Sequence, residues 1–324
     1  MKKQMVSAVS AAFCAALLLG NGALAQKTGR VGSLKGPTSI GLLHFMEEEN
    51  TDDDPDFTFE MMTAADELAA KFVNDEIDFA LLPANMASIL YHRTNGNVQV
   101  VDINTLGVLY LVTAQEGIDS VADLKGKTVY MTGKGQTPEY VLNYLLEVNG
   151  LTEDVTVEFK SEAAEVVSVL AQETSAIAVL PQPFATVACQ KSGNKKMTMA
   201  DLTQEWDAAG NGRMVTGVTV VKKDFAQAND DLMEDFLEDH EESAAFVNRN
   251  TEAAARLAVS YSIMEQEAAA EAAIPKCNIT YLDGADMKAA LSGYLQVLMD
   301  QNPDSVGGAL PGDDFYYTYV EADD

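Results

Sequence analysis

Two stretches of this chain match each other without a gap. Residues 63–83 read TAADELAAKFVNDEIDFALLP, residues 161–181 read SEAAEVVSVLAQETSAIAVLP, and both end on a Leu-Pro pair. A second matched pair lies upstream of each copy, beginning at Leu34 and at Gly133. Each half therefore repeats the same alternation of strands and helices. Such a repeat predicts two similar α/β lobes, which normally enclose something between them.

The length of the chain agrees with two lobes, because 324 residues exceed what one hydrophobic core usually serves. The β-branched run at 216–221 is not followed by a third copy of the repeat, and we interpret it as the strand that returns the chain to the first lobe. Alanine-rich, acidic helices are expected after it, at 231–248, 252–261 and 285–299. The predicted division is lobe one from 26–113 together with 220–324, and lobe two from 114–219. Two chain crossings would then form a hinge.

The first 25 residues have the composition of a secretory signal. Lys2 and Lys3 precede an apolar run at 8–19, and Ala23-Leu24-Ala25 provides a site of small residues for cleavage. We therefore predict a cleaved signal peptide at 1–25 and an extracytoplasmic protein, located in the periplasm or, in a Gram-positive host, at the cell surface. An uncleaved anchor is the alternative, but the run is shorter than the ~20 residues that a membrane-spanning helix needs.

The chain is strongly acidic. It holds 50 acidic and 21 basic residues, for a formal net charge of −29. Nucleic acid and anionic membrane surfaces are poor partners for such a charge, so we expect neither. We interpret the charge as favouring solubility.

Residues that could bind a metal or form a disulfide are few. His44, His92 and His240 lack paired metal-binding spacing, and no GxSxG nucleophile motif occurs. We therefore expect no metal, no cofactor and no catalytic residue. Cys189 and Cys277 remain after signal cleavage, and the sequence leaves open whether they pair.

Four turns that follow predicted strands are candidates for ligand contact, because open α/β sheets bind ligands outside the carboxyl ends of their strands, where helices begin. Each could instead be no more than a helix start, as when Thr38 or Ser39 caps a helix. The residues after the two Leu-Pro pairs differ, so we expect Asn85 on one side and Gln182 with Phe184 on the other to discriminate between ligands. The four turns are 36–39, 83–85, 133–138 and 181–184.

A fifth turn, Thr105-Leu106-Gly107, is expected between two strands at 98–103 and 107–113 beside the first crossing. It either lines the cleft or is a tight connection that needs its glycine. Lys134 and Arg213 are the basic residues near the predicted cleft segments, and they would balance the charge of an anionic ligand.

Motifs along the chain resemble one known family. KGPTSIGLLHFMEE, FALLPANMASILY, NTLGVLYLV and AVLPQPFATVA resemble the substrate-binding components of ABC importers of the nitrate/sulfonate/taurine and thiamine-precursor type. The resemblance covers nearly all of the chain after the signal. It implies the type II periplasmic-binding fold: two α/β lobes, each a mostly parallel sheet flanked by helices, with two hinge crossings and the ligand between them. Carried onto this sequence, the ligand-binding residues are Gly36, Pro37, Thr38, Ser39, Thr63, Ala64, Pro83, Asn85, Thr105, Leu106, Gly135, Gln136, Thr137, Gln182 and Phe184.

The resemblance also implies a function. We expect a monomeric binding protein, not an enzyme, that captures a small polar solute and delivers it to the permease of an ABC transporter. A sulfonate, a nitrate-like anion or a heterocycle like a thiamine precursor would be such a solute. The alternative is a lyase or dehydratase on the same fold. Export weighs against it, as does the lack of an acid–base pair in the turns.

Overall fold

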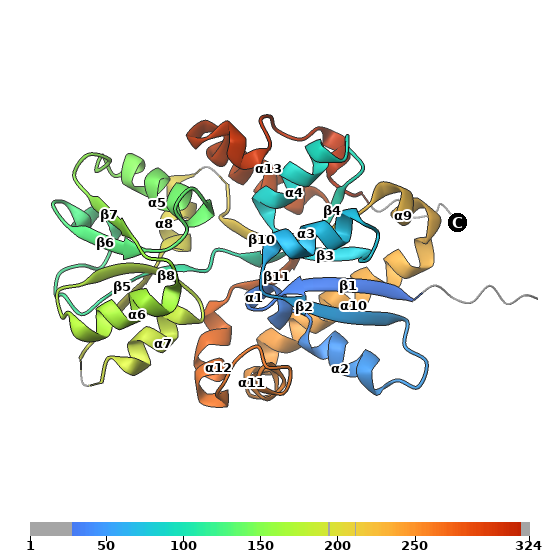
Figure 1. Ribbon diagram of the computed structural model, residues 1–324, viewed down its shortest axis with the longest axis horizontal. Helices are drawn as coiled ribbons and strands as arrows, with labels where there is room; N and C mark the ends of the chain where they lie inside the picture. The colour runs from blue at the N-terminus through green and yellow to red at the C-terminus, as the bar shows by residue number, and fades with distance from the viewer. Residues whose placement is uncertain (1–27, 194, 211, 319–324) are drawn as a thin grey trace, which may run out of the picture.

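The structure is a computed structural model that describes residues 28–193, 195–210 and 212–318. Its strands form two sheets, one of six strands and one of five. Figure 1 shows the sheets toward opposite ends of the molecule, with the chain crossing between them. The predicted signal peptide at 1–25 lies outside the described residues.

The first sheet combines strands from both ends of the chain. β1, β2 and β3 are parallel to one another, β4 runs with them, and β10 and β11 run in the opposite direction. In sheet order the strands are β11 (Ile279–Leu282), β4 (Gln99–Leu106), β10 (Val215–Val221), β3 (Phe79–Pro83), β1 (Gly29–Leu34) and β2 (Phe57–Met62).

The second sheet repeats the plan of the first. β6, β7 and β8 are parallel, β9 runs with them, and β5 runs in the opposite direction. In sheet order the strands are β7 (Thr156–Phe159), β6 (Thr128–Met131), β8 (Ile177–Pro181), β5 (Leu109–Thr113) and β9 (Thr198–Asp201). The order β2-β1-β3 thus matches β7-β6-β8, which confirms the predicted α/β fold class with two similar, mostly parallel sheets.

Helices cover both faces of each sheet (Figure 1). The helices that follow the repeated strands are α1 (Pro37–Ile40), α2 (Leu43–Thr51), α3 (Ala65–Val73), α4 (Ala84–Arg93), α5 (Thr137–Val148), α6 (Ala163–Gln172) and α7 (Phe184–Lys191). The others are α8 (Leu202–Ala209), α9 (Lys223–Ala228), α10 (Asp230–Arg249), α11 (Thr251–Ser260), α12 (Glu267–Ala273) and α13 (Gly284–Gln301). Short 3₁₀ helices are η1 (Val121–Leu124), η2 (Ile274–Lys276), η3 (Pro303–Val306) and η4 (Asp313–Phe315).

The strands beside the crossings differ from the sequence expectation. The predicted turn at Thr105-Leu106 is wrong, because β4 continues through both residues and pairs there with β10 and β11. β5, which we expected in the first lobe, pairs with β8 and β9 of the second sheet. β10 pairs along its whole length with strands of the first sheet, so the chain returns before residue 219.

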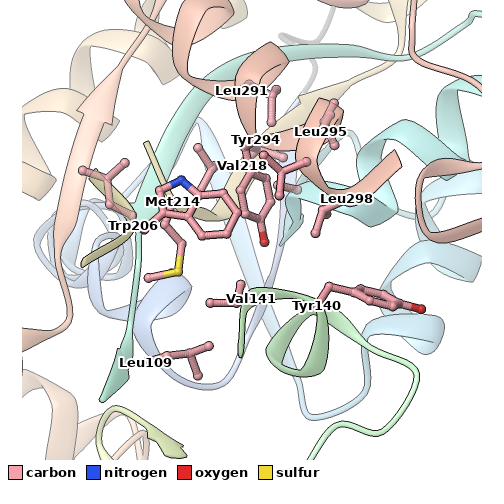
Figure 2. Packing of buried hydrophobic residues seen from close by; sticks show 14 of the residues in the cluster. Leu109, Tyr140, Val141, Trp206, Met214, Val218, Leu291, Tyr294, Leu295 and Leu298 are labelled. Carbon is pink, nitrogen blue, oxygen red and sulfur yellow. The ribbon is translucent and has the colours of Figure 1, made fainter. Parts of the chain in front are cut away.

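Two groups of aromatic residues anchor the core. Beneath the first sheet, the buried rings of Phe79 and Phe236 stack with their centroids 4.1 Å apart. Between the sheets, buried Trp206 of α8 packs against Tyr144 of α5 and Tyr294 of α13, at ring-centroid distances of 4.5 and 5.5 Å. Figure 2 shows Trp206 and Tyr294 of this second group together with Met214 and the leucines of α13. The apolar core therefore continues from the helices that cover the first sheet to the helices that cover the second.

Candidate functional site

A cleft of about 510 Å³ lies where β3 and β8 end, between elements of the two sheets. Parts that pack on the first sheet contribute Ala65, Pro83, Asn85, Met86, Thr216 and Tyr294 to its lining. Parts of the second sheet contribute Leu109, Gly135, Gln136, Thr137, Tyr140 and Pro181. Its volume falls in the range typical of small-molecule sites.

The repeated Leu-Pro pairs lie at equivalent places beside this cleft. Pro83 at the end of β3 pairs with Gly217 of β10, and Pro181 at the end of β8 pairs with Leu109 of β5. β10 and β5 are the strands that follow the two crossings. The cleft is therefore bordered by the carboxyl ends of parallel strands and by the chain segments that join the sheets.

Hydrogen bonds connect the two sides of the cleft. The Thr137 hydroxyl of α5 donates to Asn85 Oδ1 of α4 at 3.3 Å, and Asn85 Nδ2 donates to the Ser305 carbonyl at 3.2 Å. Asn302 Nδ2 donates to the Tyr140 hydroxyl at 3.0 Å. The side chains of α4 and of the segment after α13 are thus in direct contact with α5 of the second sheet.

The side chains that line the cleft carry little charge. Within the described part of the chain, none of the lining residues is Lys, Arg or His, and Asp304, at the exposed rim, is the one carboxylate. Lys134 and Arg213, the basic residues expected near the cleft, are both exposed and do not line it. Lys134 instead places its Nζ 5.8 Å from the centre of the Phe159 ring.

Tyr294 brings the most deeply buried hydroxyl to the cleft. The residue is 1% exposed, and within the described part of the chain its hydroxyl has no hydrogen-bond partner. Burial raises the pKa of Tyr294, an effect that the neighbouring Thr137 side chain offsets only in part. Figure 2 shows the hydroxyl directed from α13 toward Val141 and Tyr140 of α5. Tyr294 is not among the ligand-binding residues expected from the sequence.

Five of the residues proposed from the sequence lie in the cleft lining: Pro83, Asn85, Gly135, Gln136 and Thr137. They come from one turn of each copy of the repeat. Thr63 and Ala64 are exposed and immediately precede Ala65, which does line the cleft.

Gln182 and Phe184 lie outside the cleft lining. The buried Gln182 side chain accepts a hydrogen bond from Thr186 Oγ1 at 2.9 Å, and its Nε2 lies 3.7 Å from Met199 Sδ. Its amide is therefore engaged within its own sheet and helix. Phe184 is 38% exposed at the start of α7.

The turn at 36–39 and the segment 105–106 also lie outside the lining. Gly36, not Thr38 or Ser39, precedes α1, and Pro37 is its first residue. The Thr38 and Ser39 hydroxyls donate to the Leu34 carbonyl, at 2.8 and 2.6 Å. Thr105 and Leu106 are buried in β4, where the Thr105 hydroxyl donates to Asn104 Oδ1 at 2.9 Å.

The histidines serve local packing and hydrogen bonding. Buried His240 lies 3.1 Å from Asp102 through its Nδ1, His44 stacks on Phe246, and His92 contacts the Ala309 carbonyl. Among the described residues, no group of three or more His, Cys, Asp or Glu side chains gathers as a metal site.

The two thiols are unpaired. Cys189 and Cys277 are both free, and burial raises the pKa of Cys277 to about 12. None of the helices in the described ranges has the length and apolarity needed to cross a membrane.

A larger hollow of about 680 Å³ lies between α5 and α13. Tyr144, Glu147, Gly293 and Gln296 are among the residues that line it, and none of the described lining residues belongs to a strand. We therefore take the smaller cleft as the candidate site, because it lies at the strand ends of both sheets.

Two sheets of matching order, joined by crossing segments around a cleft, define the class of two-lobed α/β periplasmic binding proteins. The sequence agrees with this class: residues 41–205 match the family model of the phosphonate-type periplasmic substrate-binding proteins of ABC transporters. The chain belongs to this family. No curated protein matches the chain in sequence.

Solved structures share the fold. An ABC transporter protein from Parabacteroides distasonis superposes with a TM-score of 0.77 at 23% identity, covering 91% of this chain and 100% of that one. The periplasmic aliphatic sulphonate binding protein of Escherichia coli gives 0.72 at 15% identity, covering 92% and 94%. A putative nitrate transport protein from Thermoplasma volcanium gives 0.55 at 12% identity, covering 85% and 93%.

Proposed function

We propose that this chain captures a small solute outside the cytoplasm and delivers it to the permease of an ABC transporter. The observation that carries this proposal is the cleft of about 510 Å³. Its lining includes the ends of strands from both sheets and the first residues of the helices that follow them. A site built from two bodies can close around a solute by rotation at the segments that join them. Family membership and the structural relatives support the same function.

The proposal includes the division into lobes. We place lobe one around the first sheet and lobe two around the second, with one crossing at 107–108, between β4 and β5, and the other between α8 and β10. The signal at 1–25 and an extracytoplasmic location are part of the same proposal, because a solute-binding component must meet its solute outside the membrane.

Thermal stability of the purified chain tests solute capture. A solute that binds the folded state raises its stability by RT ln(1 + [L]/Kd), about 2.7 kcal/mol at a hundredfold excess over Kd. We expect fractions of a bacterial metabolite extract to raise the Tm. The solute, identified by mass spectrometry of what the protein retains, should be recovered chemically unchanged. A solute consistently converted to a product would support an enzyme instead.

Two variants that each add a phenyl ring test whether the solute binds in this cleft. Thr216→Phe fills part of the cleft, whereas Ser292→Phe adds the same ring to the hollow between α5 and α13. We expect Thr216→Phe to abolish the Tm response and Ser292→Phe to keep it. If no fraction raises the Tm of the parent chain, or if Thr216→Phe responds as the parent does, solute capture in this cleft is refuted.

A further inference from the structure

We propose that the cleft takes a solute with an apolar body and without a phosphonate, sulfonate or comparable anionic headgroup, and that the Tyr294 hydroxyl is a specificity-determining contact to it. This inference rests on the proposed function and names the class of solute. It departs from the anionic ligands for which the family and the sulphonate and nitrate relatives are named.

The charges around the cleft oppose an anion. Removing a full negative charge from water is costly unless a cation or several donors replace the water. No basic side chain is present among the described residues that line the cleft, and Asp304 adds a negative charge at its rim. The chain as a whole carries a formal net charge of −29, which lowers the local concentration of anions further.

The helix ends at the cleft do not replace the missing cations. A carboxylate oxygen of Glu139 already accepts the Gly135 N–H at the start of α5. The Asn302 side chain accepts the Asp304 N–H at the start of η3 at 3.1 Å. The start of α4 remains, next to Asn85, and a helix end supplies only about half an elementary charge.

The remaining lining favours an apolar body. Met86, Ile89, Val108, Leu109, Val141 and Met214 line the cleft. A volume of about 510 Å³ has room for more than ten water-sized groups at roughly 30 Å³ each. A nitrate-sized ion would fill little of it. Apolar walls with a few polar groups are typical of sites for organic ligands.

Tyr294 supplies the polar contact. Tyr294 lines the cleft, and its buried hydroxyl has no hydrogen-bond partner among the residues that the structure describes. A buried polar group without a partner is costly, and a ligand group that hydrogen-bonds to it removes that cost. Because burial raises the pKa of Tyr294, the hydroxyl keeps its proton at neutral pH and can both donate and accept.

The test compares solute classes by thermal shift and calorimetry. Methylphosphonate, ethanesulfonate, taurine, 2-aminoethylphosphonate and nitrate, each at millimolar concentration, should leave the Tm unchanged. A bacterial metabolite extract should raise the Tm through the fraction that an anion exchanger does not retain. The solute recovered from that fraction should bind Tyr294→Phe about tenfold more weakly, the loss expected for one hydrogen bond between neutral groups.

The matched control is Tyr144→Phe, which removes a hydroxyl from the same aromatic group but lines the other hollow. It should bind with unchanged affinity. Because no described residue is a hydrogen-bond partner of the Tyr294 hydroxyl, Tyr294→Phe should not lower the Tm of the free protein, so loss of binding is separable from misfolding.

The outcomes separate this inference from the proposed function. A Tm rise with any of the five probes overturns the proposed solute class and leaves solute capture intact. The same holds if the Tm rises only with the fraction of the extract that the anion exchanger retains. Unchanged affinity in Tyr294→Phe overturns the role of Tyr294. If no fraction and no probe raises the Tm, the proposed function fails, and the inference fails with it.

Discussion

The fold opposes ionisation of the Asp239 carboxyl group. Burial raises its pKa to about 6, and the nearby carboxylates of Glu49, Asp235, Glu48 and Glu238 reinforce the effect. Glu48 and Glu49 belong to α2, and the others belong to α10. The contact between these two helices therefore concentrates negative charge, and the chain is less stable at neutral pH because of it.

We predict that Asp239→Asn stabilises the protein at pH 7. The pKa of an aspartate in an unfolded chain is about 3.9, so between roughly pH 4 and 6 the folded state binds more protons. The stability that protonation provides is complete below the unfolded pKa and is lost as the pH rises through the folded pKa. Because Asp239 is only partly buried, solvent screening limits the gain at pH 7 to about 1 kcal/mol.

Urea unfolding at pH 7 and near pH 4 checks this. The difference between Asp239→Asn and the parent should be much smaller at the lower pH, since Asp239 is then protonated in the folded state and about half protonated in the unfolded chain. Asp66→Asn, a change of the same kind at an exposed position in the first turn of α3, should show no such gain. A difference that is equal at both pH values would show that packing, not charge, is responsible.

Residues at the site were predictable where the chain turns after a strand. Pro83, Asn85 and Thr137 follow from that rule and line the cleft. Gln182 follows from the same rule, but Thr186, one helical turn onward, holds its side chain within the second lobe. Tyr294 could not be identified, because its spacing within a helical apolar pattern indicates core packing and says nothing about where its hydroxyl points.

The start of helix α2 depends on a residue far away in the sequence. Leu42 precedes α2 and offers no side-chain cap. Ser243 of α10 takes over this role: its hydroxyl accepts the backbone N–H groups of His44 and Phe45, both at 3.2 Å, and donates to the Gly41 carbonyl at 2.7 Å. A single buried hydroxyl therefore satisfies groups that a local Ser or Thr usually satisfies.

We predict that Ser243→Ala lowers the free energy of unfolding by about 1–3 kcal/mol, because it leaves two donors and one acceptor of buried backbone without this partner. Denaturant unfolding measures the loss. Ser168→Ala is the matched control: its exposed hydroxyl donates to Ala164 within α6, and its removal should change stability by less than about 0.5 kcal/mol. Equal losses in the two variants would contradict a capping role for Ser243.

Long helices with a repeating apolar face could be predicted from the sequence. The turns where the chain crosses between the sheets could not. The helices expected at 231–248 and 285–299 are α10 and α13, with ends displaced by one or two residues, because an apolar face repeated over many turns fixes the element. Asn104 and Thr105 have the composition of a turn. They extend β4 because Asn104 Nδ2 donates to Thr219 Oγ1 of β10 at 3.1 Å, a tertiary contact that local sequence does not indicate.

Hydrogen bonds across the cleft help to hold the two sheets and their helices together. Besides the Thr137–Asn85 and Asn302–Tyr140 hydrogen bonds, Gln301 Nε2 at the end of α13 donates to Glu147 Oε2 of α5 at 3.0 Å. These bonds are polar contacts between side chains of α4, α5 and the end of α13, which lie on opposite sides of the cleft. Rotation of one lobe at the crossings would break them and open the cleft.

We predict that binding of the captured solute closes the molecule and that Gln301→Ala weakens this closure without touching the solute. By small-angle X-ray scattering, the solute should lower the radius of gyration of the parent chain. Since the Gln301–Glu147 contact is exposed, its removal should weaken apparent affinity by about fivefold or less. Gln296→Ala removes a bond to Asp300 within α13 and should bind as the parent does. A radius of gyration that is identical with and without bound solute would show that the lobes do not move, and would refute the hinge.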